Sequence, residues 1–173
     1  MYSLGYDLGS SSIKASVVDL QSCKPIAQYS YPSYEMPMIS LRQGWAEQNP
    51  EDWWINLQAV TKAVIAESNI KADQIVSIGI AYQMHGLVAV DQLLKPVRPS
   101  IIWCDSRAVE YGNAAFNGIG EKYCLENYLN SPGNFTASKL AWVQKNEPDK
   151  FGTIYKIMLP GEYIILYMVP NLS

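Results

Sequence analysis

The first fourteen residues, Met1-Tyr-Ser-Leu-Gly-Tyr-Asp-Leu-Gly-Ser-Ser-Ser-Ile-Lys14, decide the fold that we expect for the whole chain. Apolar side chains alternate with others from position 4 to position 8, which is typical of a strand with one buried face. This strand breaks at Gly9-Ser-Ser-Ser12, and a second strand is predicted over 13–19. The sequence therefore predicts a β-hairpin with a tip of small residues.

The hairpin tip has the chemistry of a phosphate-binding loop. Small side chains leave backbone N–H groups and hydroxyls open to anionic oxygens. Asp7 can hold Mg²⁺ through water, and Lys14 can bring a positive charge to the same phosphates. Three structural alternatives stay open, because such tips also occur in hairpins without a ligand, Asp7 can simply stabilise a turn, and Lys14 can be a solvated strand residue. The residues predicted to contact phosphate are Gly9, Ser10, Ser11, Ser12 and Lys14.

The composition narrows the class of protein. The chain has 173 residues, of which 49% are hydrophobic, so it can bury a sizeable core, and one domain is expected. A formal net charge of −3 without a Lys/Arg cluster argues against a nucleic-acid partner. The sequence shows no signal peptide and no apolar run of about 18 residues, so we expect no membrane partner and a cytoplasmic location. Three scattered cysteines and one histidine argue against disulfides and structural zinc.

Downstream of the hairpin, the pattern alternates between strands and helices. Strands or extended segments are predicted at 25–31, 75–81, 87–91, 99–104 and 154–158. Helices are predicted from Pro50 onward, over 106–117, over 121–128, from 136 or 137 to 146, and over 160–168. The 75–81 strand is continuously apolar, so we expect it to be buried on both faces and to pair in parallel with an earlier strand.

A second candidate site follows the 75–81 strand, at Met84-His85-Gly86. Ligands of open α/β sheets gather beyond the carboxyl ends of the strands. His85 can donate to or accept from a hydroxyl group with its ring nitrogens, and Met84 offers an apolar wall. A purely structural role for this single histidine is the alternative.

A charged pair, Asp105 and Arg107, stands at the start of the helix predicted over 106–117. Asp105 can cap that helix and pair with Arg107, so a structural role and a role at the ligand site are equal alternatives. Three tryptophans are predicted to pack in the core and not to stack on a ligand; they are Trp45, Trp53 and Trp54.

Six motifs, taken in their order, resemble those of the FGGY family of carbohydrate kinases, with bacterial xylulokinases as the most similar branch. They lie at 7–14, 44–54, 83–86, 103–107, 134–142 and 157–163, within about residues 2–164. The resemblance implies an α/β fold, an actin-like ATPase (ribonuclease H-like) domain with a mixed sheet and flanking helices, here incomplete. Residues 1–173 are then a partial N-terminal domain, and the C-terminal domain is absent.

The resemblance also implies an activity, namely phosphorylation of a ketose by ATP, with D-xylulose, giving D-xylulose 5-phosphate, as the first choice. ATP and Mg²⁺ are the implied cofactors, with Asp7 on the metal side, and a small-molecule sugar is the implied partner. The implied sugar-site residues are Met84, His85, Gly86, Asp105 and Arg107. The catalytic base of the family is an aspartate expected beyond Ser173, so residues 1–173 alone are expected to be inactive. A non-catalytic sugar-binding or partner module, derived from a sugar kinase, is the alternative.

The last ten residues, 164–173, depart from the family pattern and are largely apolar. Truncation, a shifted reading frame and a deliberate boundary are all consistent with this departure. An apolar run near a chain end favours self-association, so a homodimer is a further hypothesis.

Overall fold

The computed structural model describes residues 1–169 and divides the chain into two compact units. Unit 1 comprises Met1–Pro37, Pro50–Gln83 and the stretch from Pro160 on. Unit 2 comprises Met38–Asn49 and Met84–Leu159. Each unit is therefore built from segments that are far apart in the sequence.

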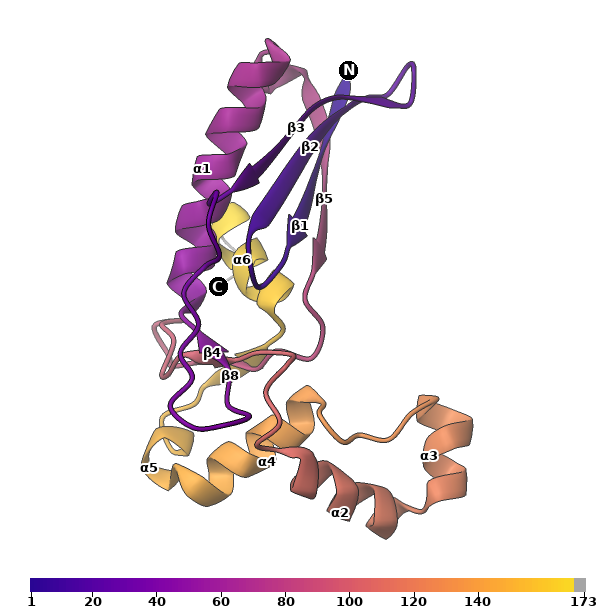
Figure 1. Ribbon diagram of the computed structural model, residues 1–173, viewed down its shortest axis with the longest axis vertical. Coiled ribbons are helices and arrows are strands. Elements are labelled where there is room, and N and C mark those ends of the chain that lie inside the picture. The colour runs from indigo at the N-terminus through magenta and orange to yellow at the C-terminus, as the bar shows by residue number, and fades with distance from the viewer. Residues whose placement is uncertain (170–173) are drawn as a thin grey trace. The chain divides into compact units, whose positions relative to one another are not determined.

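Unit 1 contains a four-stranded mixed sheet (Figure 1). Its strands, in the order β3-β2-β1-β5, are Lys24–Tyr31, Ile13–Asp19, Tyr2–Leu8 and Ile75–Tyr82. Strands β1 and β2 pair in antiparallel fashion, as do β2 and β3, whereas β1 and β5 are parallel. The predicted hairpin, its third strand and the parallel partner of the first strand are all confirmed, and so is the α/β class with a mixed sheet.

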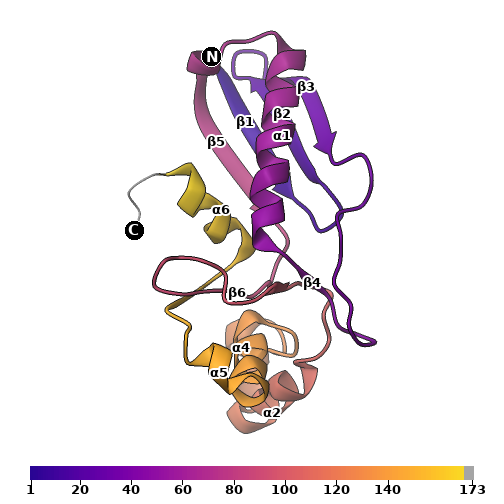
Figure 2. The same cartoon turned by 90° about the vertical axis from the view of Figure 1, so that its left-hand side faces the viewer.

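Helix α1, Pro50–Ser68, lies along one face of this sheet, against β2 and β3 (Figure 2). Proline at the first helical position and acids in the first turn, Glu51 and Asp52, favour a helix start at this point. The apolar side chains of α1 meet those of β1 and β2 and form the core of the unit. Its buried members include Leu4, Leu8, Ile13, Val17, Trp53, Leu57, Val60 and Val64.

A short 3₁₀ turn, η1 at Ala72–Gln74, leads into β5, and helix α6, Pro160–Met168, packs against α1 and β5. Gly161 allows this approach, because a Cβ atom there would lie 2.1 Å from the Tyr82 ring. Trp54 stacks on Tyr167 of α6 with ring centroids 5.2 Å apart, and Trp53 is fully buried, which confirms packing roles for both tryptophans. Residues 170–173, the end of the apolar run that suggested self-association, lie outside the described residues.

The prediction that 75–81 is buried on both faces is wrong for the residues that the structure describes. Val76 and Ile78 of β5 are 55% and 54% exposed. The reason is position: β5 ends the strand order of the sheet, and α1 covers β2 and β3, at the other side of β1. The continuous apolar run thus predicted the strand correctly, but its burial on both faces incorrectly.

Unit 2 is built from four helices and two small antiparallel pairs. Strand β4, Glu47–Gln48, pairs with β7, Ser100–Ile101, and β6, Val88–Val90, pairs with β8, Lys156–Met158. The helices are α2, Val109–Ile119, α3, Glu121–Tyr128, α4, Thr136–Asn146, and α5, Pro148–Phe151. Their core contains Leu87, Ile101, Ala108, Trp142 and Val143.

Three details of unit 2 differ from the sequence-based expectation. Helix α2 begins at Val109 instead of 106, because the Asp105 carboxylate holds the backbone N–H of Arg107 in a turn before the helix. The short β4 and α5 were not predicted, since two to four residues carry too little periodicity to be recognised.

Among the described helices, none combines the length and the apolar character needed to cross a bilayer.

Candidate functional site

The hairpin of unit 1 presents an exposed ion pair. Asp7 and Lys14 are register partners on β1 and β2, and Lys14 Nζ donates to Asp7 Oδ2 at 2.9 Å. Their side chains are 50% and 60% exposed. Tyr6, the neighbour of Asp7, bonds to Thr61 of α1 at 2.7 Å, so Asp7 points to the opposite face of the sheet. That face carries a hollow of about 490 Å³ lined by Asp7, Lys14, Ser16, Gln28 and Ser30, among others.

The hairpin tip is tight and anchored. A Cβ atom at Gly9 would lie 2.9 Å from the backbone oxygen of Ser12, so only glycine fits without a shift of the backbone. The carbonyl of Ser11 accepts a hydrogen bond from the backbone N–H of Met36 at 2.8 Å. Ser30 Oγ donates to Ser12 Oγ at 3.1 Å. The tip predicted to bind phosphate is therefore held in one shape by contacts outside it.

One exposed carboxylate suits Mg²⁺ but not a metal that needs a protein cage. Mg²⁺ keeps several waters and takes one or two carboxylates together with phosphate oxygens. Within the described residues, no group of three or more His, Cys, Asp and Glu side chains is arranged to hold a metal ion. Asp7 suits Mg²⁺ bound in this way, through water and phosphate oxygens, and its role at a metal stays a prediction.

The His85 corner, residues 84–86 of unit 2, combines an exposed side chain with a constrained backbone. Met84 is 63% exposed, and His85 has a left-handed backbone with φ of 58°. The His85 ring stacks on Phe135 with centroids 4.3 Å apart and an interplanar angle of 23°. Burial, and next the positive charge of Lys139, lower the pKa of His85 below its ordinary 6.5. A neutral imidazole at pH 7 can donate from one ring nitrogen and accept at the other.

Lys139 of α4 is buried beneath this corner. Its residue is 0% exposed, and Nζ donates to the carbonyls of His85 at 2.8 Å and Asn134 at 2.7 Å. Burial lowers the pKa of Lys139 to about 8, although the nearby carboxylate of Asp105 acts in the other direction. The corner is thus attached to α4 through a charged amine.

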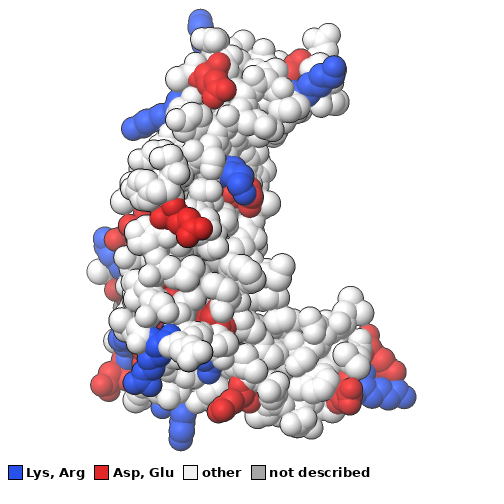
Figure 3. Space-filling view, viewed as in Figure 1, with Lys and Arg blue, Asp and Glu red and all other residues white. Residues whose placement is uncertain are grey.

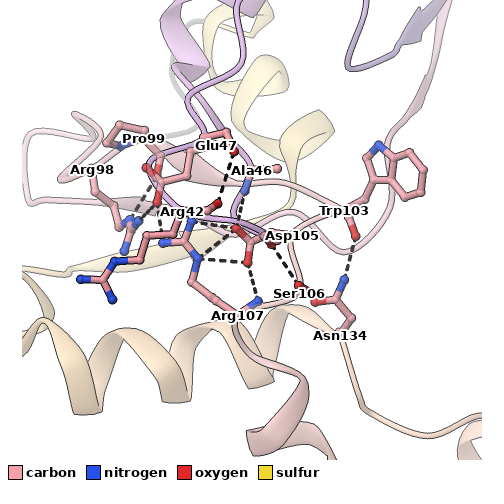
Figure 4. Close-up of polar contacts among 12 residues, drawn as sticks. Arg42, Ala46, Glu47, Arg98, Pro99, Trp103, Asp105, Ser106, Arg107 and Asn134 are labelled. Atoms are coloured by element: carbon pink, nitrogen blue, oxygen red, sulfur yellow. Dashed lines mark hydrogen bonds and ion pairs between the residues drawn. The ribbon is translucent and has the colours of Figure 1, made fainter.

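Asp105 and Arg107 form the centre of a buried network (Figure 4). Asp105 Oδ2 accepts from the backbone N–H of Ala46 at 2.6 Å and from Arg107 Nη2 at 2.7 Å. The Arg107 guanidinium lies 3.8 Å from the centroid of the Trp45 ring and 4.9 Å from that of Trp142. The packing role predicted for Trp45 is confirmed. With Asp105 at 0% exposure, this pair holds the framework together.

The network continues through Glu47, whose loop was expected to line or support the ligand site, and through Arg98 and Glu147, which the sequence did not single out. Glu47 pairs with Arg107 at 2.5 Å and also with Arg98. Arg98 in turn bonds to Glu147 at 2.5 Å. Glu47 of β4 lies within the recognised 44–54 motif, whereas Arg98, before β7, and Glu147, at the end of α4, lie outside the six motifs, so no local spacing could have revealed these two. The Lys139, Phe135 and Thr136 contacts had a signal, because the 134–142 motif was recognised without a role for its members.

The surface carries charges of both signs. Figure 3 shows Lys and Arg side chains interspersed with Asp and Glu on the face that it draws, without a continuous basic patch.

The comparisons with known proteins agree with one another. Residues 2–172 match the model of the N-terminal domain of the FGGY family of carbohydrate kinases. The chain is 32% identical over 170 residues to a xylulose kinase of Klebsiella pneumoniae, covering 98% of this chain and 34% of that protein. It is also 32% identical to an L-xylulose/3-keto-L-gulonate kinase of Escherichia coli, over 94% of this chain and 32% of that protein.

The solved structures are similar in fold as well. A crystal structure of a xylulose kinase from Brucella ovis superposes with a TM-score of 0.85 and 32% identity, covering 96% of this chain and 34% of that one. The chain therefore spans about a third of the length of the curated relatives that it matches.

Proposed function

The chain belongs to the FGGY family of carbohydrate kinases, and from that premise we propose that the protein carrying it phosphorylates a ketose with ATP. D-xylulose, giving D-xylulose 5-phosphate, is the first choice of substrate. The observation that carries the proposal is the 32% identity to a xylulose kinase across 98% of the chain. The relative named for L-xylulose and 3-keto-L-gulonate, at the same identity, keeps the choice among ketoses open to experiment.

The hairpin of unit 1 is the proposed site for the phosphates of ATP. Backbone N–H groups and hydroxyls of the Gly9–Ser12 tip suit phosphate oxygens, and Lys14 adds positive charge. Asp7 is the proposed holder of Mg²⁺ through water, and that ion supplies neutralisation of phosphate charge when bound. The exposed Asp7–Lys14 pair supports this assignment, because both side chains are open to a ligand.

The His85 corner of unit 2 is the proposed site for the sugar. His85 is the hydrogen-bonding group for a sugar hydroxyl, and the exposed Met84 is an apolar wall for the carbon chain. Gly86 is buried, so its proposed part is to shape the corner. Asp105 and Arg107 are proposed to support this site without touching the sugar, because Asp105 accepts from the backbone N–H groups of Ala46 and Arg107, and the Arg107 guanidinium pairs with Asp105 and Glu47.

Phosphoryl transfer also needs a base at the attacking hydroxyl. We propose that this base is an aspartate beyond Ser173, and that Asp105 does not replace it because Asp105 is fully buried and bonded to Arg107. The chain of 173 residues should then bind ligands without turnover.

Sugar-dependent ADP release tests the proposal. It is measured for residues 1–173 and for the chain extended through its downstream reading frame, with D-xylulose, other ketoses and glycerol. Turnover by the extended chain alone, with D-xylulose preferred, is the expected result. An extended chain that binds sugar without sugar-stimulated ADP release would instead be a non-catalytic module.

A further inference from the structure

We propose that the start of α4 is a clamp that holds the His85 corner in its ligand-binding conformation, with Lys139 as the central positioning residue. The clamp consists of Asn134, Phe135, Thr136 and Lys139. None of these four is assigned to the sugar site above. The inference rests on the proposed function only in taking the corner to be the sugar site.

The backbone of the corner needs an external hold. The backbone of His85 has a φ of 58°, in the left-handed region that residues other than glycine adopt only uncommonly. Such a conformation persists where surrounding contacts determine it. The free corner would therefore relax toward ordinary backbone angles and move the imidazole away from its present position.

Lys139 supplies the strongest of these contacts. Its ammonium group donates to the His85 carbonyl at 2.8 Å and to the Asn134 carbonyl at 2.7 Å, so one buried charge ties the corner to the loop before α4. Hydrogen bonds from a charged donor are about twice as strong as neutral ones. A fully buried lysine without a directly bonded carboxylate is costly, and its two carbonyl partners account for its position.

Residues at the start of α4 and just before it make the other contacts of the clamp. Thr136 Oγ1 donates to the Gly86 carbonyl at 3.3 Å, and the Phe135 ring stacks on the imidazole at 4.3 Å. Asn134 Nδ2 donates to the backbone carbonyl of Trp103 at 2.8 Å, which links the clamp to the backbone of a second exposed residue. The Met84 side chain of the corner is exposed.

The single histidine makes the clamp directly measurable, because the chain yields one set of imidazole NMR signals. In the native chain, the Phe135 ring current should shift the His85 carbon-bound protons upfield. K139M should move these signals toward their random-coil positions, while K145M should not. Lys145 is the matched control, since it is exposed in the last turn of the same helix.

A milder pair of variants covers the case in which K139M does not fold. T136V removes the hydroxyl that reaches the Gly86 carbonyl, and T136S retains it. T136V should shift the His85 signals in the same direction as K139M but less, and T136S should restore them. Unchanged His85 signals in a folded K139M, or in T136V, would overturn the clamp.

Kinetics of the extended chain separate this inference from the proposed function. K139M should raise the KM for D-xylulose about tenfold or more and leave the KM for ATP unchanged. If the His85 signals move as expected while sugar binding does not change, the clamp stands and the corner is not the sugar site. A kinase that is fully active with D-xylulose, together with unmoved His85 signals in K139M, means that the proposed function stands and the clamp fails.

Discussion

The hairpin of unit 1 and the buried network of unit 2 hold their charges in opposite ways. Asp7 and Lys14 are seven residues apart and about half exposed. Asp105 and Arg107 are at most 9% exposed, and their partner Glu47 comes from another part of the chain. The carboxylate oxygens and ammonium protons of the hairpin pair stay accessible to solvent, whereas the charged groups of the network bond to one another inside the protein.

This difference separates ligand binding from support. An exposed ion pair adds little stability, because water screens it, and so it can exchange partners with a charged ligand at small cost. A buried pair cannot lose one member without leaving the other desolvated and unpaired. The same residue types are therefore expected to affect affinity in the hairpin and stability in the network.

The largest expected effect is on the network. D105N replaces one carboxylate oxygen by an NH₂ group that faces N–H donors of Ala46 or Arg107, so we expect a loss of about 3–5 kcal/mol in the free energy of unfolding. Urea unfolding followed by tryptophan fluorescence measures it, since Trp45 and Trp142 flank Arg107. D149N, at an exposed position of α5, should stay within about 0.5 kcal/mol of wild type. A loss below about 1 kcal/mol in D105N would remove the distinction between the two regions.

Next in size is a pH effect from Lys139. With a folded-state pKa of about 8 against an ordinary 10.5, folded Lys139 binds fewer protons than the unfolded chain between these values. The free energy of unfolding should therefore rise with pH across that window, by at most about 1.4 kcal/mol per pH unit, and K139M should lack this contribution. Below pH 8 both states are protonated and no slope arises. Equal slopes in urea unfolding of wild type and K139M at pH 8–10 would contradict this.

A packing variant of unit 1 follows, since the Lys139 effect can reach about 3 kcal/mol over the whole window from pH 8 to 10.5. G161A places a Cβ atom 2.1 Å from the ring of Tyr82, and overpacking of this kind costs about 1–3 kcal/mol. G118A is the matched control, because nothing lies within 4 Å of its Cβ and alanine favours a helix interior. Thermal unfolding should show G161A below wild type and G118A at or above it. A G161A midpoint at or above that of wild type would refute the close approach of α6.

The smallest effect on stability is expected at the hairpin. D7N removes an exposed pair and should change the free energy of unfolding by less than about 1 kcal/mol, while weakening Mg²⁺-dependent binding of ATP. Chemical unfolding and ATP titration with and without Mg²⁺ measure the two quantities on one protein. If D7N destabilised the chain as much as D105N does, the hairpin would be a structural element like the network.

Much of the architecture was readable from local patterns. The hairpin, its third strand, the 121–128 and 160–168 helices and the start of α1 follow from alternation, periodicity and proline placement within a few neighbouring residues. The order of six motifs also identified the family, because each motif is local even though the series spans the chain.

The sequence by itself therefore determined the β-hairpin with Asp7, the small-residue tip and Lys14, since strand alternation and turn chemistry act between neighbours. Only the tertiary structure decided that Asp105 is buried, that the Arg107 guanidinium packs on Trp45 and Trp142, that Lys139 reaches the His85 carbonyl, and that β5 is exposed. Burial and long-range hydrogen bonds depend on which distant segments meet. The identity of a residue such as aspartate or lysine does not show whether its side chain is exposed to water or buried in a core.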